Sequence, residues 1–128
     1  MQEVTLRRGS GKYEVFLTAI LIGSDISVHI FGGESPHIGA VAIGMPRKSL
    51  KGDGSDSASV SVICVPAHKE DALCQRTASK LSTLWGCYVT VIAGIHIDRA
   101  TSSDLEQLNA NIEWLINALI ENRQNNKY

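Results

Sequence analysis

The segment that most constrains the fold is YEVFLTAILIG, residues 13–23. Its middle is apolar at every position but one, so both of its alternating faces are apolar if it forms a strand. A strand of this kind is normally covered on both sides of its sheet. Each face of this strand therefore needs other residues packed against it.

The remaining pattern is a series of short strands, with helical periodicity only in the second half. One helix is expected over 68–84, and another over 102–122, where Thr101 and Asp104 form a capping-box pattern. Residues 45–57 read as a polar, glycine-rich loop. The expected strands are 3–8, 13–23, 25–33, 37–44, 57–66 and 87–98.

This β-β-β-β-β-α-β-α order predicts an α+β fold, in which a mostly antiparallel sheet carries both helices on one face. Two helices on one face leave the other face of the strand in 13–23 without cover. A second copy of the chain is the obvious candidate for that cover, although a curled sheet would also serve. We therefore expect a homodimer.

Composition excludes several classes of protein. The 128 residues are 44% hydrophobic and 20% charged, which predicts one globular domain over 1–128. A net charge of −1 provides no overall basic field for nucleic acid. The longest apolar run is too short to span a membrane, and the N-terminus lacks the order of a signal peptide. Three cysteines without a CxxC pair favour a reducing, cytoplasmic setting.

Three of the four histidines are expected to meet at one rim of the sheet. If 37–44 lies antiparallel between 25–33 and 57–66, His37 begins its strand near the point where the last of these ends, and His68 follows there. If 57–98 is a parallel crossover, His96 and Asp98 end at the same rim. His29 lies mid-strand and outside this group. Both helix N-termini would arrive at this rim, where their N–H groups favour anions such as phosphate.

Glycine and proline accompany the rim histidines. Gly39 lies two residues from His37, and Gly94 lies two residues from His96. Residues two apart on a strand lie on the same face, so each histidine has a neighbour without a side chain on its own face. That leaves room for a flat ligand or for a close backbone. Pro36 restricts the direction in which the chain enters the strand.

Three uses of this cluster remain open from the residues alone. The imidazoles and Asp98 could bind a divalent metal, although the spacing lacks HExxH or a dense zinc pattern. A histidine could act as an acid or base near pH 7. The groups could also bind a polar heteroaromatic ligand whose phosphate meets a helix end. Each residue also has a purely structural explanation, as part of a turn, a helix start or close packing.

Three stretches, GGESPHIGAVAIG, SVSVICVPAHKEDAL and VTVIAGIHIDRAT, resemble the LpdD-like prenylated flavin chaperones, the small D subunits found beside hydroxyarylic acid decarboxylases of the gallate, vanillate and 4-hydroxybenzoate type. The resemblance covers about residues 12–124 and departs at Ala67, where the family often has glycine. It implies a fold similar to that of the small, dimeric proteasome-assembly chaperones.

The resemblance further implies a non-catalytic protein that binds prenylated FMN, or FMN itself. Such a protein holds the cofactor between the flavin prenyltransferase that makes it and the decarboxylase that uses it. A metal is not expected, because the histidine spacing lacks a metal-binding pattern. The matching motifs suggest the cofactor-binding residues Pro36, His37, Gly39, His68, Lys69, Gly94, His96 and Asp98.

Two other functions stay in view. One is a ligand-free assembly chaperone, or small subunit of the decarboxylase complex, whose histidines are structural. The other is a small metal-dependent enzyme that uses His37, His68, His96 and Asp98.

Overall fold

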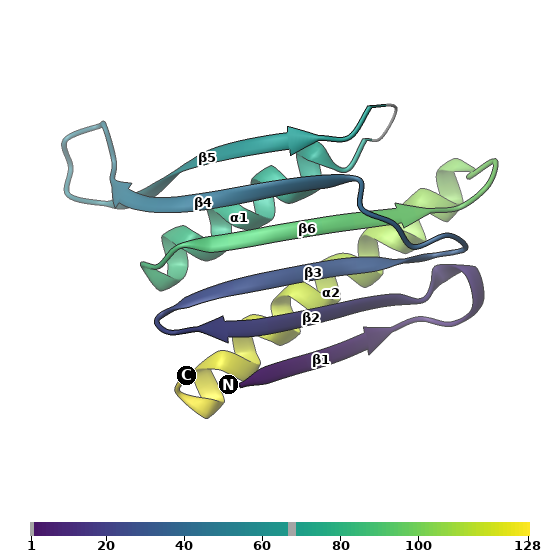
Figure 1. Ribbon diagram of the computed structural model, residues 1–128, viewed down its shortest axis with the longest axis horizontal. Coiled ribbons are helices and arrows are strands. Elements are labelled where there is room, and N and C mark those ends of the chain that lie inside the picture. Colours follow the sequence, from purple (N-terminus) through teal and green to yellow (C-terminus); the bar gives the residue numbers. More distant parts are fainter. Residues whose placement is uncertain (1, 67–68) are drawn as a thin grey trace.

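The computed structural model describes residues 2–66 and 69–128 and shows a six-stranded sheet with two long helices behind it (Figure 1). The α+β class, the mostly antiparallel sheet and the element order are confirmed. A short 3-10 helix, η1 (Gly11–Tyr13), precedes the second strand. The strands are β1 (Glu3–Arg8), β2 (Val15–Ile22), β3 (Asp25–Gly33), β4 (Ala40–Lys48), β5 (Asp56–Cys64) and β6 (Val89–His96), and the helices are α1 (Asp71–Trp85) and α2 (Ser102–Asn126).

The strand order is β1-β2-β3-β6-β4-β5, which corrects one expected pairing. β3 and β4 are not neighbours, because β6 lies between them, parallel to β3 and antiparallel to β4. The reason is that the chain over 34–39 is no tight turn but steps across the end of β6 (Figure 1). The expected antiparallel pairing of β4 with β5 is confirmed. Because both β5 and β6 are antiparallel to β4, they point toward the same rim.

The strand formed around residues 37–44 is displaced from its expected position. It begins at Ala40 and continues to Lys48, so the loop expected over 45–57 shrinks to 49–55. The polar residues after Met45 pair in register with the start of β5, and this ladder keeps them extended. β4 pairs with β6 only as far as Gly44, so Pro46 stands where one side of the strand has become an edge, a position that tolerates proline.

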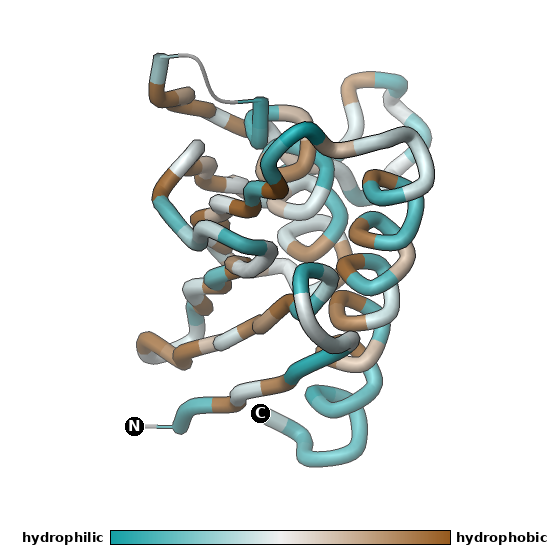
Figure 2. Tube along the Cα trace, turned by 90° about the vertical axis from the view of Figure 1, so that its right-hand side faces the viewer, coloured by the Kyte–Doolittle hydropathy of each residue, from teal (hydrophilic) through white to brown (hydrophobic). Residues whose placement is uncertain are grey.

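Both helices cover the same face of the sheet (Figure 2). α1 packs on β4, β5 and β6, whereas α2 packs on β1 and β2. Leu81 of α1 and Leu115 of α2 are fully buried there, in a core that also includes Val15 and Leu17 of β2. Among the described residues, no helix combines the length and apolar character that crossing a membrane requires.

The other face of the sheet, called the open face below, carries an apolar band that one chain leaves uncovered. In register, Phe16 lies opposite Phe31, with their rings stacked 5.4 Å apart. The band continues across the sheet through Ile92, Val41 and Ile63. The strand in 13–23 therefore does have two apolar faces, of which α2 covers one.

Candidate functional site

The backbone over residues 34–39 crosses the end of β6 on the open face and is fastened to it. The amide of Glu34 donates to the His96 carbonyl at 2.7 Å, and the amide of Gly39 donates to the Ala93 carbonyl at 2.9 Å. The crossing requires glycine beneath it, because a Cβ on Gly94 would collide with the carbonyl oxygen of His37. The sequence predicts that the space above Gly94 holds either a flat ligand or a close backbone. In the structure, the backbone of His37 occupies this space.

This crossing places the His37 ring against a carboxylate that sequence reasoning missed. His37 Nδ1 lies 2.9 Å from the Ser35 carbonyl oxygen, and Nε2 lies 3.0 Å from Oε1 of Glu70. The Glu70 side chain is only 12% exposed, although residues 69–71 read as a solvated first turn. Its carboxylate also accepts hydrogen bonds from the amides of Ile95 at 3.2 Å and Lys69 at 3.0 Å.

Glu70 also explains the second glycine of the pattern. A Cβ on Gly39 would collide with the Glu70 carboxylate, so Gly39 makes room for this side chain. Both rim glycines therefore serve contacts within the protein itself.

Three of the predicted residues do come together at this rim. The rings of His37 and His96 are 6.4 Å apart, and His96 Nε2 lies 2.8 Å from Oδ1 of Asp98. The pair of His96 and Asp98 is exposed, and the Asp98 amide donates to Glu34. Lys69 is exposed at the start of α1. His68 lies outside the described residues, and a role for any of these residues in cofactor binding stays a prediction.

A cavity of about 330 Å³ opens beside the crossing, on the open face. Contrary to the sequence-based expectation, His29 belongs to this site. The alternation of β3 was the signal that could have included it, since His29 and Phe31 point to one face. The residues that line the cavity are His29, Ile30, Phe31, Pro36, His37, Ile38 and Ile92.

The two helix N-termini do not offer equal anion sites. At α2 the capping box is formed, because the Asp104 amide donates to Thr101 Oγ1 and the Thr101 amide donates to Asp104 Oδ2, both at 3.0 Å. Hydrogen bonds, above all from the Tyr13 hydroxyl and then from the Thr101 amide, hold the pKa of Asp104 below its usual range. This end thus carries its own carboxylate, which disfavours a phosphate there. At α1 the N-cap Glu70 makes no side-chain cap hydrogen bond.

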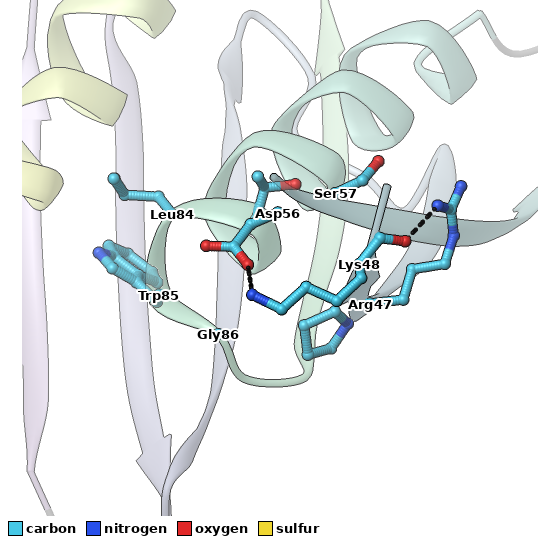
Figure 3. A pocket seen from close by; sticks show the side chains of 9 residues that line it. Arg47, Lys48, Asp56, Ser57, Leu84, Trp85 and Gly86 are labelled. Atoms are coloured by element: carbon cyan, nitrogen blue, oxygen red, sulfur yellow. Dashed lines mark hydrogen bonds and ion pairs between the residues drawn. The ribbon is translucent and has the colours of Figure 1, made fainter. Parts of the chain in front are cut away.

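The opposite rim holds a larger cavity, of about 410 Å³, between the ends of β4 and α1 (Figure 3). Its basic residues are engaged locally, since Lys48 pairs with Asp56 at 2.7 Å, and Arg47 donates to Ser59 Oγ at 2.8 Å. Across residues 2–66 and 69–128, no three His, Cys, Asp or Glu side chains are grouped so that they could hold a metal ion. The cavity at the opposite rim therefore adds no residue to the candidate site around His37 and His96.

The fold is similar to that of a protein of known structure. It aligns with a solved chain of a chaperone complex for yeast 20S proteasome assembly, with a TM-score of 0.50, 16% identity and 98% of both chains covered. At that identity the likeness establishes the fold alone. A search of curated proteins finds no match.

The family follows from the sequence match. The model of the prenylated flavin chaperone LpdD-like domain matches residues 9–124, and this chain belongs to that family. The match confirms the resemblance carried by the three stretches around His37, Lys69 and His96.

Proposed function

We propose that this protein binds prenylated FMN in the cavity of about 330 Å³ on the open face and holds it for a prenylated-FMN-dependent hydroxyarylic acid decarboxylase. It would act without turnover of its own, as a homodimer in the cytoplasm, and receive the cofactor from a flavin prenyltransferase. Family membership supports the ligand and the chaperone role. The observation that carries the proposal is the meeting of an aromatic, apolar surface with imidazoles at one cavity.

The cavity fits the ring part of such a cofactor. Its volume is at the lower end of the roughly 300–1,000 Å³ typical of small-molecule sites. Phe31, Ile38 and Ile92 provide apolar surface for a flat ring, His29 provides a polar group at its edge, and the His37 ring completes the lining. The ring system would occupy this cavity, and the ribityl phosphate chain would extend from it along the rim.

For the phosphate, the residues at the rim favour the start of α1. Lys69 is exposed there, and its ammonium group can reach a phosphate although the Glu70 carboxylate already accepts its amide and Asp71 lies in the first turn. The N-terminus of α2 is occupied by Asp104. We therefore assign the phosphate to Lys69 and the α1 end, with His96 as a second contact.

The homodimer is supported by the apolar band on the open face. Phe16, Phe31, Ile92, Val41 and Ile63 follow one another across the sheet without a covering helix. Two copies stacked on this face would cover the band and close the cavity from solvent. Light scattering at micromolar concentration tests this, and a stable monomer would refute the dimer.

A matched pair of exposed residues tests the site. Ile38 lies on the cavity wall and is 62% exposed, whereas Leu50 lies in the loop at the opposite rim and is 88% exposed. Losing the burial of one aliphatic side chain costs about 1.5–3 kcal/mol, so Ile38→Asp should weaken prenylated FMN binding roughly 10- to 150-fold. Leu50→Asp should bind as the wild type does. Equal affinity for both variants would place the ligand elsewhere.

Delivery needs its own experiment. The protein is mixed with prenylated FMN, separated by gel filtration and added to the apo form of the decarboxylase, and carbon dioxide release is then measured. We expect faster activation than with the same amount of unbound cofactor. If the protein elutes without cofactor yet binds the decarboxylase tightly, the ligand-free assembly role is correct instead.

A further inference from the structure

A short line of hydrogen-bonded side chains runs across the middle of the open face and ends at the cavity. Thr90 on β6 and Ser27 on β3 are register partners, and Thr90 Oγ1 donates to Ser27 Oγ at 2.7 Å. Ser27 Oγ lies 3.1 Å from Nε2 of His29, two residues along the same strand. His29 in turn lines the cavity. Neither the sequence pattern nor the family description assigns a role to these three residues.

The donor–acceptor direction of these hydrogen bonds determines which nitrogen of His29 carries the proton. Ser27 is only 9% exposed, and its oxygen already receives the proton of Thr90. A buried hydroxyl also needs an acceptor for its own proton. The acceptor that the described residues place within reach is His29 Nε2. Nε2 then accepts, and the neutral ring carries its proton on Nδ1.

We propose that the Nδ1–H of His29 is a hydrogen-bond donor of the cavity and that it selects a planar heterocycle with an acceptor, a carbonyl oxygen or an unprotonated ring nitrogen, on its edge. Thr90 and Ser27 are positioning residues, because they act only by holding this tautomer. The inference rests on the proposed function, since it names the atom of the flat ligand with which His29 forms a hydrogen bond. A ring without an edge acceptor would leave the donor unpaired and bind more weakly.

The first test observes the tautomer without any ligand. The nitrogen chemical shifts of the His29 ring distinguish a proton on Nδ1 from one on Nε2. At a pH where the ring is neutral, the wild-type protein should show the proton on Nδ1, and Ser27→Ala should show a mixture of both tautomers. A wild-type ring protonated on Nε2 refutes the inference, whatever the protein binds.

The second test measures affinity for prenylated FMN by absorbance titration. His29→Phe keeps an aromatic ring but removes the donor, and should weaken binding roughly 5- to 150-fold. Ser27→Ala should lose less, about 3- to 10-fold, because the ring can still present Nδ1–H part of the time. Ser59→Ala is the matched control, since Ser59 Oγ accepts a side-chain hydrogen bond from Arg47 at 2.8 Å at the opposite rim and does not line the cavity. It should bind as the wild type does.

The outcomes separate the two proposals. If the wild-type protein does not bind prenylated FMN, the proposed function fails, while the tautomer measurement still decides the state of His29. If the wild type binds and folded His29→Phe binds equally well, the donor role is wrong and the proposed function stands. If His29→Phe does not fold, Ser27→Ala decides in the same way through its affinity and its ring shifts.

Discussion

Replacing Gly94 with alanine should lift the chain off β6 at the candidate site. The Cβ of the new residue would collide with the carbonyl oxygen of His37, and it would also lie 3.1 Å from the amide nitrogen of Ile38. Both contacts are backbone, and Gly94 itself is held in the ladder between β6 and β3 as the register partner of Phe31, so neither side can yield by rotating a side chain. The segment 34–39 must move.

The cost follows from the hydrogen bonds that hold this segment. Lifting it breaks the bond from the His37 amide to the Gly94 carbonyl, at 3.4 Å, and strains the bond from the Gly39 amide to the Ala93 carbonyl, at 2.9 Å. Each such bond contributes about 0.5–1.5 kcal/mol, and a buried group left without a partner costs about 1–3 kcal/mol. Alanine recovers roughly 0.5–1 kcal/mol over glycine in a strand. The net loss of unfolding free energy should be about 1–3 kcal/mol.

Thermal unfolding and amide hydrogen exchange measure the two parts of this effect. At roughly 4 °C per kcal/mol for a chain of this size, Gly94→Ala should melt about 4–12 °C lower. The Gly39 amide should also exchange faster than global unfolding explains, because the crossing opens locally.

Gly44→Ala provides the control, since its Cβ would meet the Ala78 carbonyl oxygen of α1 at 2.5 Å and leave the crossing alone. It should lose stability while Gly39 exchange follows the global value. Unchanged melting and unchanged Gly39 protection in Gly94→Ala would refute the reasoning.

Three further predictions concern charge, thiol reactivity and the core. The pKa of Asp104 lies lower in the folded than in the unfolded state, so its stabilising effect is present above about pH 4 and lost as the pH falls further. Asp104→Asn should therefore reduce the difference between urea midpoints at pH 7 and pH 3. Burial raises the pKa of Cys74 to about 12, so a thiol reagent at pH 8 should modify exposed Cys64 first, and mass spectrometry should find Cys74 labelled only after unfolding. Leu115→Ala should cost about 2–5 kcal/mol in denaturant unfolding, because Leu115 is fully buried, whereas half-exposed Leu105 should cost less than about 1 kcal/mol.

The parts of the fold that depend on local pattern could be predicted from the sequence. The capping box at Thr101 and the buried positions of α2 follow from helical periodicity and local hydrogen bonding, and both are present. The same periodicity predicts that Leu84 and Leu105 continue the apolar stripes of their helices, yet both are about half exposed. They lie at the ends of their helical stripes, where the helix runs past the sheet, and no local rule shows where that happens.

Strand order depended on information that local pattern does not carry. Residues 32–37 contain two glycines and a proline, which are typical of a tight turn between neighbouring strands. The same residues equally suit a chain that steps over another strand, because Gly33 adopts a φ of +74° and Gly94 lets the crossing pass close above it. Gly94 lies about sixty residues away in the sequence. The partner of the crossing could therefore not be chosen from the turn alone.

The candidate site shows the same division between local and distant information. His37, His96 and Asp98 could be brought to one rim from strand directions, and this grouping survived the error in strand order because β4 is antiparallel to both of its neighbours. Glu70 and His29 could not be found in this way. Glu70 is buried only because Gly39 leaves space for its carboxylate, and His29 meets the cavity only because the crossing builds a wall above β3. Both depend on the segment 34–39, so the His37–Glu70 pair and the cavity are consequences of a single backbone crossing. A substitution that moves this crossing should therefore change the His37–Glu70 pair and the cavity together.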